Sequence, residues 1–331
     1  MNIFLLRFNT LMMFLLGTML SLPGFGQDQI VTYLNKHRHI VAEKDSAQYI
    51  RTLTPSKEPN APYKLLEQYI TGEVYRTGRA LFFHDRITLV DLVTTFQKDG
   101  KRISEEHYKE GAPVGVCRYY YKNGKLKSEI IAPGRTGEGR EDLKMDVPPA
   151  KLVAFYDSLG MQLVKDGDGY VRDVDDDKDV EEGSYKNGYK DGEWKGTFLK
   201  QKYRYTERYK EGDLLEGLSV DSAGTEVPYN KVQEQPVYPD GMPALYRFIG
   251  MNYRYPRQAY QQRVNGAVVL SFVVDKEGKL VDIKVVQDLG LGTGEEGIRV
   301  LRAAPRWKPG KLRGIPVRVS FTIPIHLNLQ G

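Results

Sequence analysis

The sequence contains few of the residues on which most enzymes and metalloproteins depend. It has one Cys, 2 Trp and 5 His among 331 residues, and it shows no pattern of a serine hydrolase, a zinc protease or a cysteine nucleophile. Because Cys117 is the only thiol, no disulfide can form within the chain, and packing must stabilise the fold. We therefore expect no catalytic residue, no metal, no cofactor and no enzymatic activity.

Long apolar runs are also scarce. The only one covers 11–22, after Arg7 and before the turn-forming residues of 23–27. A positive charge, about a dozen apolar residues, and small residues at Gly24 and Gly26 are the three parts of a signal peptide, here covering 1–26. A membrane-spanning helix needs ~20 apolar residues. We therefore expect an exported, periplasmic protein; an uncleaved helix that anchors the chain in the inner membrane, facing the periplasm, is the alternative.

Strong charge clusters of one sign are absent as well. The net charge is only +5, and basic residues outnumber acidic ones from Pro236 onward. No basic run, zinc-finger spacing or aromatic ribonucleoprotein motif accompanies this excess, so nucleic acid is not expected as a partner.

Three short motifs resemble ligand sites, but each lacks a required part. The glycine pattern of 292–297 follows a strand that belongs to a hairpin, so no parallel βαβ unit for a dinucleotide is expected. The acidic run of 173–179 lacks the glycine and the closing glutamate of an EF-hand loop, which favours a solvated turn. His37 and His39 have no third ligand nearby in the sequence, so a metal is not expected.

Tyrosine and glycine are abundant, with 22 and 33 residues. The tetrapeptide Tyr-Lys-x-Gly, with Asn or Glu as its third residue, begins at Tyr108, Tyr121, Tyr185 and Tyr209. Tyr185 and Tyr209 lie 24 residues apart (209 − 185), and a fixed period of this size indicates stacked supersecondary units. Each unit is predicted to be a hairpin with an aromatic strand and a glycine turn.

These segments resemble the MORN-type repeats of bacterial envelope proteins, in the antitoxin-type variant whose core reads Gly-x-Tyr-x-x-Gly-x-x-x-Gly-x-Trp. The similarity is closest over 183–194, whereas Cys117 stands where another copy would have Trp. The resemblance implies an all-β sheet of hairpins over 27–228, used as a scaffold or interaction surface. The Pro- and Gly-rich stretch of 132–150 predicts either a long loop or a break in the series.

The C-terminal part has a different, mixed pattern, which makes the fold class α+β. Helices are predicted over 243–251, 256–262 and 295–304. Strands are predicted over 266–274, 280–286 and 317–325. Pro324 within the last strand indicates an edge position, because proline cannot donate to a ladder on both sides.

Three motifs in this part carry a second resemblance. Arg254–Ala259 reads RYPRQA, Gly266–Lys279 reads GAVVLSFVVDKEGK, and Trp307–Lys311 reads WKPGK. Together they resemble the C-terminal domain of TonB, the periplasmic energy transducer, over 238–327 within a domain expected at 229–331. The family's fold, a three-stranded antiparallel sheet packed on helices, agrees with the predicted elements. The matching positions, expected to be mainly structural, are Tyr255, Pro256, Gly266, Phe272, Asp275, Gly278, Trp307, Pro309 and Gly310.

The TonB resemblance implies a partner and a binding mode. In that family, a short extended segment of an outer-membrane TonB-dependent transporter adds as a strand to an exposed edge. The last strand is the candidate here because it ends the domain and contains Pro324. The predicted peptide-binding residues are Val317, Arg318, Val319, Ser320, Phe321, Thr322 and Ile323. Among them, Arg318 could select the partner, although a merely solvated arginine is an equal alternative.

The chain departs from the usual transducer in two ways. It lacks the long Pro-rich spacer, and its N-terminus reads as cleavable rather than as a retained membrane helix. The leading hypothesis is therefore a periplasmic protein that binds a transporter peptide by β-strand addition in TonB-dependent transport. One alternative is a structural envelope scaffold whose repeats bind a partner. Another is an anchored energy transducer, which would also contact inner-membrane motor proteins.

Overall fold

The computed structural model describes residues 29–36, 38, 40–41, 44–57, 63–83, 86–135 and 149–328. The predicted signal peptide lies outside this range, as do His37 and His39. Within the described residues, no helix is both long enough and apolar enough to cross a membrane.

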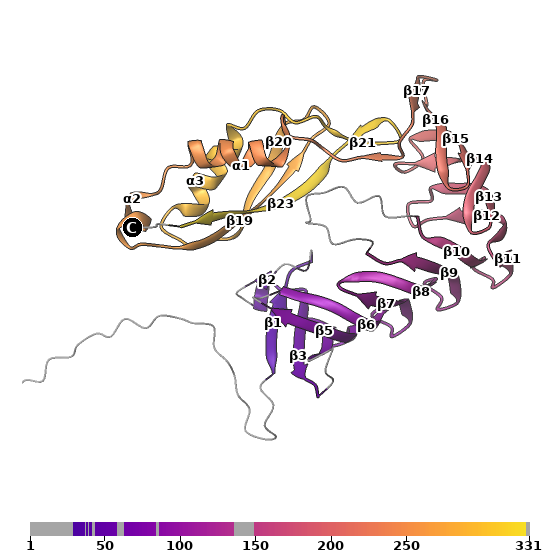
Figure 1. Ribbon diagram of the computed structural model, residues 1–331, viewed down its shortest axis with the longest axis horizontal. Helices are drawn as coiled ribbons and strands as arrows, with labels where there is room; N and C mark the ends of the chain where they lie inside the picture. Colours follow the sequence, from indigo (N-terminus) through magenta and orange to yellow (C-terminus); the bar gives the residue numbers. More distant parts are fainter. Residues whose placement is uncertain are drawn as a thin grey trace, which may run out of the picture.

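The first part of the chain is an antiparallel sheet of 17 strands, which we call the repeat sheet (Figure 1). Its first nine strands are β1 (Ile30–Leu34), β2 (Ile40–Val41), β3 (Tyr49–Pro55), β4 (Tyr63–Tyr69), β5 (Val74–Phe83), β6 (Arg86–Phe96), β7 (Arg102–Lys109), β8 (Ala112–Tyr120) and β9 (Leu126–Pro133). The others are β10 (Lys151–Tyr156), β11 (Gln162–Lys165), β12 (Asp168–Val174), β13 (Val180–Lys186), β14 (Tyr189–Phe198), β15 (Tyr203–Lys210), β16 (Asp213–Asp221) and β17 (Glu226–Tyr229). A short 3-10 helix, η1 (Lys44–Ser46), precedes β3.

Strands of the repeat sheet pair in chain order. From β3 to β17 each strand is bonded to the next, and β1 pairs with both β2 and β3. Strands β9 and β10 pair from Lys151↔Ile131 to Phe155↔Ser128, so the sheet continues across the stretch where a break was one of the two expectations. The predicted hairpin repeat is therefore confirmed as a continuous series of hairpins.

Two-residue turns connect several of these strands as the tetrapeptides predicted. Asn187 and Gly188 both have positive φ, 53° and 87°, and Glu211 and Gly212 repeat this geometry at 51° and 91°. Two successive residues with positive φ define the type I′ turn, whose twist matches that of the flanking strands. Glycine is the residue that adopts this conformation at least cost.

In the copy closest to the repeat motif, over 183–194, a glycine lies opposite a large ring. Gly183 pairs with Trp194 across β13 and β14, and a Cβ on Gly183 would lie 2.3 Å from the indole. Trp194 is fully buried and meets Tyr185 and Tyr209 edge-on. Cys117, the expected replacement for this ring in another copy, is also fully buried.

The C-terminal domain is an α+β unit, as predicted. Its helices are α1 (Gly241–Asn252), α2 (Arg257–Gln261) and α3 (Thr293–Arg302). Its sheet contains β20 (Leu280–Gln287), β19 (Gly266–Val274) and β23 (Val319–Leu327), in the order β20-β19-β23. Leu245 of α1 and Leu301 of α3 are buried in one apolar cluster with Leu270 and Phe272 of β19.

The glycines of 292–297 serve this packing. A Cβ on Gly297 would lie 2.7 Å from the Leu270 side chain, and one on Gly294 would lie 2.8 Å from that of Val285. Helix α3 therefore needs both glycines to approach the sheet closely.

A small second sheet joins the two parts of the chain. It consists of β18 (Gln233–Glu234), β21 (Gly310–Leu312) and β22 (Ile315–Val317). Strands β21 and β22 form a hairpin, here called the docking hairpin, whose turn is Arg313 and Gly314. Ile315 packs against Phe198 and Tyr205 of the repeat sheet.

Arg313 inserts from this hairpin into the repeat sheet. Its Nε lies 2.9 Å from Glu207, its Nη2 lies 3.4 Å from Glu181, and its guanidinium carbon lies 3.7 Å from the ring centroid of Tyr205. Its carbonyl oxygen accepts a hydrogen bond from the Ser219 hydroxyl at 2.8 Å. The C-terminal domain is therefore held on the repeat sheet through buried ionic, aromatic and main-chain contacts.

Candidate functional site

Strand β23 forms one edge of the C-terminal sheet. It pairs with β19 along its whole length, from Val274↔Val319 to Gly266↔Leu327. No other strand of the described chain pairs with its second side. Nine residues of backbone therefore lie at an open edge, which is the structure that an added strand requires.

Side chains alternate along β23 between the core and the opposite face. Ile323 and Ile325 are buried and Phe321 is half-buried, whereas Ser320 and Thr322 are exposed. This alternation holds β23 in register, because a one-residue shift would expose its apolar side chains.

Pro324 indicates which backbone groups face the open edge. It pairs with Val269 inside an uninterrupted ladder, and because proline has no N–H, its nitrogen must point away from β19. In an antiparallel pair every second residue turns its N–H and C=O to the same side. The N–H groups of Ser320 and Thr322 therefore face outward, and at Pro324 the series of donors is interrupted.

The predicted last strand, 317–325, begins two residues too early. Val317 belongs to β22, where it pairs with Gly310, and Arg318 joins β22 to β23. The strand is divided because the docking hairpin uses 315–317 for its own ladder. The other predicted binding residues, 319–323, all lie on β23.

Arg318 is already engaged in an ion pair. Its Nη2 lies 2.5 Å from Oδ2 of Asp282 on β20, and both side chains are more than half exposed. Ion pairs at this exposure contribute about 0–1 kcal/mol. Arg318 can therefore leave Asp282 for another acidic group at little cost.

Close packing and hydrogen bonds connect the motif residues around the β19–β20 turn. Gly278 has φ +79°, and a Cβ there would lie 1.8 Å from the carbonyl oxygen of Trp307, so only glycine fits. The Trp307 N–H donates to the carbonyl of Gly278 at 2.7 Å. The carboxylate of Asp275 accepts the N–H groups of Glu277 and Lys279 at 3.0 and 2.8 Å.

Trp307 connects this turn to the edge strand. Its indole lies 5.2 Å from the Phe321 ring and 5.8 Å from the Phe272 ring, and the two phenyl rings stack at 5.8 Å. Trp307 and Phe272 are 3% and 1% exposed, so both occupy the core. The rings support β23 from its inner face while its outer edge stays open.

The remaining motif residues lie around helix and strand ends. The Tyr255 hydroxyl donates to the carbonyl of Val264, and Pro256 precedes α2. Gly266, with φ +141°, begins β19. Pro309 comes directly before Gly310, which begins β21. None of these residues lies on β23.

One electrostatic contact fixes α3 to the RYPRQA segment. The Glu296 carboxylate accepts the N–H of Arg254 at 2.7 Å and two donors of Arg299, at 2.6 and 2.8 Å. The hydrogen bonds from Arg299 hold the pKa of Glu296 below its ordinary value. Within the described residues, no group of three His, Cys, Asp or Glu could hold a metal ion.

Two features of the molecule were not predicted from the sequence: the docking of Arg313 and a cluster of arginines around Glu67. Arg313 and Glu207 are 106 positions apart, so no local pattern connects them. A repeated Glu-x-Tyr spacing, present at Glu67, Glu106 and Glu207, was the available signal for glutamates that accept hydrogen bonds within the repeat sheet.

Comparison with known protein families gives one match. Residues 251–329 match the family described as Gram-negative bacterial TonB protein C-terminal. The match extends from the end of α1 through β23 and confirms the resemblance found in the three motifs. No curated protein matches the chain. This similarity concerns the C-terminal domain, while the MORN-like identity of the repeats stays a prediction.

Proposed function

Because residues 251–329 form a C-terminal domain of the TonB type, we propose that the chain captures an extended peptide of an outer-membrane TonB-dependent transporter as an added strand beside β23. The role is binding, without catalysis. The observation that carries the proposal is the open edge of β23, backed by Trp307 and Phe321 and unpaired along nine residues within the described chain.

Backbone hydrogen bonds would supply most of the affinity. Ser320 and Thr322 offer outward N–H groups, and the carbonyls of the same residues offer acceptors. Since Pro324 ends the series of donors, the peptide would pair mainly with 319–323. At roughly 3.3 Å per residue this stretch accommodates a short extended segment.

Selection would come from charges beside the edge. Arg318 lies at the beginning of β23 and its ion pair with Asp282 is exposed and weak. An acidic side chain at the corresponding end of the peptide would compete with Asp282 for Arg318. The proposed periplasmic location rests on the N-terminal sequence alone.

The contacts of the docking hairpin favour a second candidate function, that of a structural envelope scaffold whose repeats bind a partner. Arg313 and Ile315 hold the C-terminal domain on the repeat sheet, so a partner bound by the repeats would be kept beside β23. In this alternative the repeats make the main contact with the partner, and the C-terminal domain only docks the protein.

The proposal is tested by the affinity of the mature chain for fluorescent peptides derived from TonB-dependent transporters. Thr322→Pro removes one outward N–H without changing the ladder to β19, whereas Thr322→Ala removes the side chain and keeps the N–H. We expect Thr322→Pro to weaken binding about tenfold or more, since one hydrogen bond contributes roughly 0.5–1.5 kcal/mol and the ring also obstructs the edge. Thr322→Ala should bind normally. Equal affinities for the two variants would exclude strand addition at β23.

A further inference from the structure

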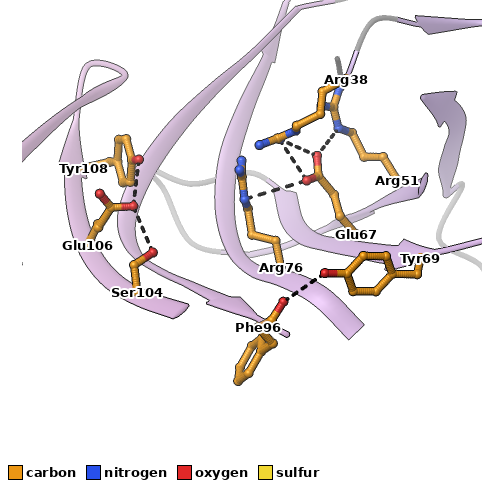
Figure 2. A network of polar contacts seen from close by, with 9 residues as sticks. All are labelled: Arg38, Arg51, Glu67, Tyr69, Arg76, Phe96, Ser104, Glu106 and Tyr108. Carbon is orange, nitrogen blue, oxygen red and sulfur yellow. Dashed lines mark hydrogen bonds and ion pairs between the residues drawn. The ribbon is translucent and has the colours of Figure 1, made fainter. Parts of the chain in front are cut away.

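The first strands of the repeat sheet bury a glutamate among more arginines than it can neutralise. Glu67 is fully buried. Arg38 donates from Nη2 to both of its carboxylate oxygens at 2.9 and 3.0 Å, Arg51 donates from Nε at 2.8 Å, and Nε of Arg76 lies 3.8 Å away (Figure 2). Among the residues that the structure describes, three guanidinium groups around one carboxylate leave an excess of two positive charges.

Strand register places these groups together. Arg51, Glu67 and Arg76 are direct partners on β3, β4 and β5, so their side chains share one face of the sheet. Arg38 reaches the same carboxylate from the connection between β1 and β2. The Arg51, Arg76 and Arg38 side chains are only 9%, 12% and 26% exposed.

The equivalent glutamates of later repeats have fewer arginine partners in the described structure. Glu106 and Glu207, like Glu67, stand two residues before a tyrosine. Glu106 accepts hydrogen bonds from the hydroxyls of Ser104, Tyr108 and Tyr119. Burial raises the pKa of Tyr108 to about 12, so its hydroxyl stays a neutral donor. Glu106 is only half-buried, but Glu207 is buried like Glu67 and has one arginine, Arg313, beside the hydroxyls of Tyr209 and Tyr229. Since one arginine is enough at Glu207, the three at Glu67 exceed what this position requires.

The arginines at Glu67 also leave donors unused. The Nε atoms of Arg38 and Arg76 are buried and have no hydrogen-bond partner in the described structure. Figure 2 shows the terminal nitrogens of Arg76 turned away from Glu67. Both guanidinium groups lie against the Tyr75 ring, at 5.7 and 5.5 Å from its centroid. A buried N–H without an acceptor is unfavourable, so an anion that accepted hydrogen bonds from these guanidinium groups would stabilise the cluster.

We propose that Arg38, Arg51 and Arg76 form a binding site for a phosphate group. The excess of two positive charges matches a phosphate monoester or inorganic phosphate, which carries −1.5 to −2 near neutral pH, whereas one carboxylate would neutralise half of it. Guanidinium groups also bind phosphate oxygens in pairs, which fits unused donors on two adjacent arginines. This site is independent of the edge of β23.

Thermal unfolding of the mature chain tests the site. Inorganic phosphate should raise the unfolding temperature by several degrees relative to sodium chloride at equal ionic strength, because a ligand that binds only the folded state stabilises it. Arg76→Gln should abolish this response and, in chloride, should leave the unfolding temperature unchanged or raised, since it removes an unneutralised charge. Arg204→Gln, at an exposed position of β15, is the matched control and should keep the full response.

Glu67→Gln should shift the unfolding temperature in chloride in the direction opposite to Arg76→Gln. It increases the excess charge, so the unfolding temperature should fall in chloride and the increment from phosphate should grow. Two results would overturn the proposal: phosphate stabilises no more than chloride, or Arg76→Gln lowers the unfolding temperature in chloride while the phosphate response persists. The second would show that Arg76 is only a structural partner of Glu67.

Vesicles distinguish the two sources of the phosphate group. Co-sedimentation is measured with vesicles that contain phosphatidic acid and, as a control, with phosphatidylserine vesicles of equal surface charge. The phosphate belongs to a lipid headgroup if the wild-type chain binds the phosphatidic acid vesicles preferentially and Arg76→Gln does not. A response to inorganic phosphate without vesicle binding identifies the free ion. If neither probe gives a response that depends on Arg76, the proposed site does not exist.

Discussion

The two large sheets of this molecule have different edge strands. Strands of the repeat sheet pair in chain order, and the sheet ends in short strands: β2 has two residues, and β17 has four and lies beside Gly314 of the docking hairpin. The C-terminal sheet has the order β20-β19-β23, which leaves the eight residues of β20 and the nine residues of β23 at its two edges. Short or covered edges prevent strand addition and long open ones permit it. The proposed peptide capture therefore suits the C-terminal sheet better than the repeat sheet.

The interiors of the two sheets differ as well. The repeat sheet buries glutamates that accept hydrogen bonds from tyrosine hydroxyls, as Tyr209 and Tyr229 do for Glu207 at 3.1 and 2.8 Å. The C-terminal domain has an apolar core of leucine, valine and aromatic side chains. The first kind of interior depends on exact hydrogen bonding, and the second depends on volume.

Substitution of the two tryptophans should have the largest effects and should separate the two regions. Trp307→Ala and Trp194→Ala should each cost about 3–5 kcal/mol, because both side chains are buried. Trp307→Ala should also abolish peptide binding, whereas Trp194→Ala should spare it. Calorimetry and peptide titration measure both quantities.

Phenylalanine at the same positions sharpens this test. The Trp194 indole N–H donates to the Ser184 carbonyl at 3.0 Å, whereas the Trp307 indole N–H has no partner in the described structure. Trp194→Phe should therefore be the more destabilising of the two conservative variants. The reverse order, or loss of peptide binding on Trp194→Ala, would contradict the division into two regions.

Breaking the docking hairpin should have the second-largest effect. Arg313→Ala leaves Glu207 buried with only tyrosine donors, and loss of one partner from a buried ion pair costs about 3–5 kcal/mol, less here because Tyr209 and Tyr229 remain. We expect the two parts of the chain to move apart, which a broader inter-domain distance distribution between paired spin labels would show.

The double variant Glu207→Gln with Arg313→Ala is the control. It should be more stable than Arg313→Ala alone, because no unpaired buried charge remains, but equally undocked. An unchanged distance distribution in both variants would show that Arg313 does not hold the domains together.

The smallest effect concerns pH. Hydrogen bonds from Arg299 lower the pKa of Glu296 in the folded state, so its contribution to stability is present above the unfolded pKa of about 4.3 and is lost as the pH falls through the lower folded value. Glu296→Gln should therefore flatten the acid limb of the stability curve of the C-terminal domain. The Glu296 carboxyl resonance, followed by NMR, should titrate below the ordinary glutamate range; an ordinary pKa would remove the role given to Arg299.

Much of the C-terminal domain followed from local patterns. The strand predicted over 266–274 matches β19 residue for residue, since its alternation lies between a glycine and a turn. The hairpin repeat followed from its glycine turns. Val317 was misplaced because the alternation of β22 and β23 runs through Arg318 without a turn residue.

The long-range contacts could not be predicted in this way. Arg51, Glu67 and Arg76 meet only because three strands are in a particular register, which bulges alter: β4 and β5 shift between Glu67 and Gln68. Arg313 finds Glu207 through the relative placement of two domains. Neither register nor docking is contained in residue spacing alone.

Hydrogen exchange of individual amides, followed by NMR with and without a transporter peptide, tests peptide capture at β23 most directly. The amides of Ser320 and Thr322 should exchange fast in the free protein and slowly in the complex, while those of Phe321 and Ile323, already bonded to β19, should change little. Protection confined to β20 or to the repeat sheet, with Ser320 and Thr322 unchanged, would contradict strand addition at this edge.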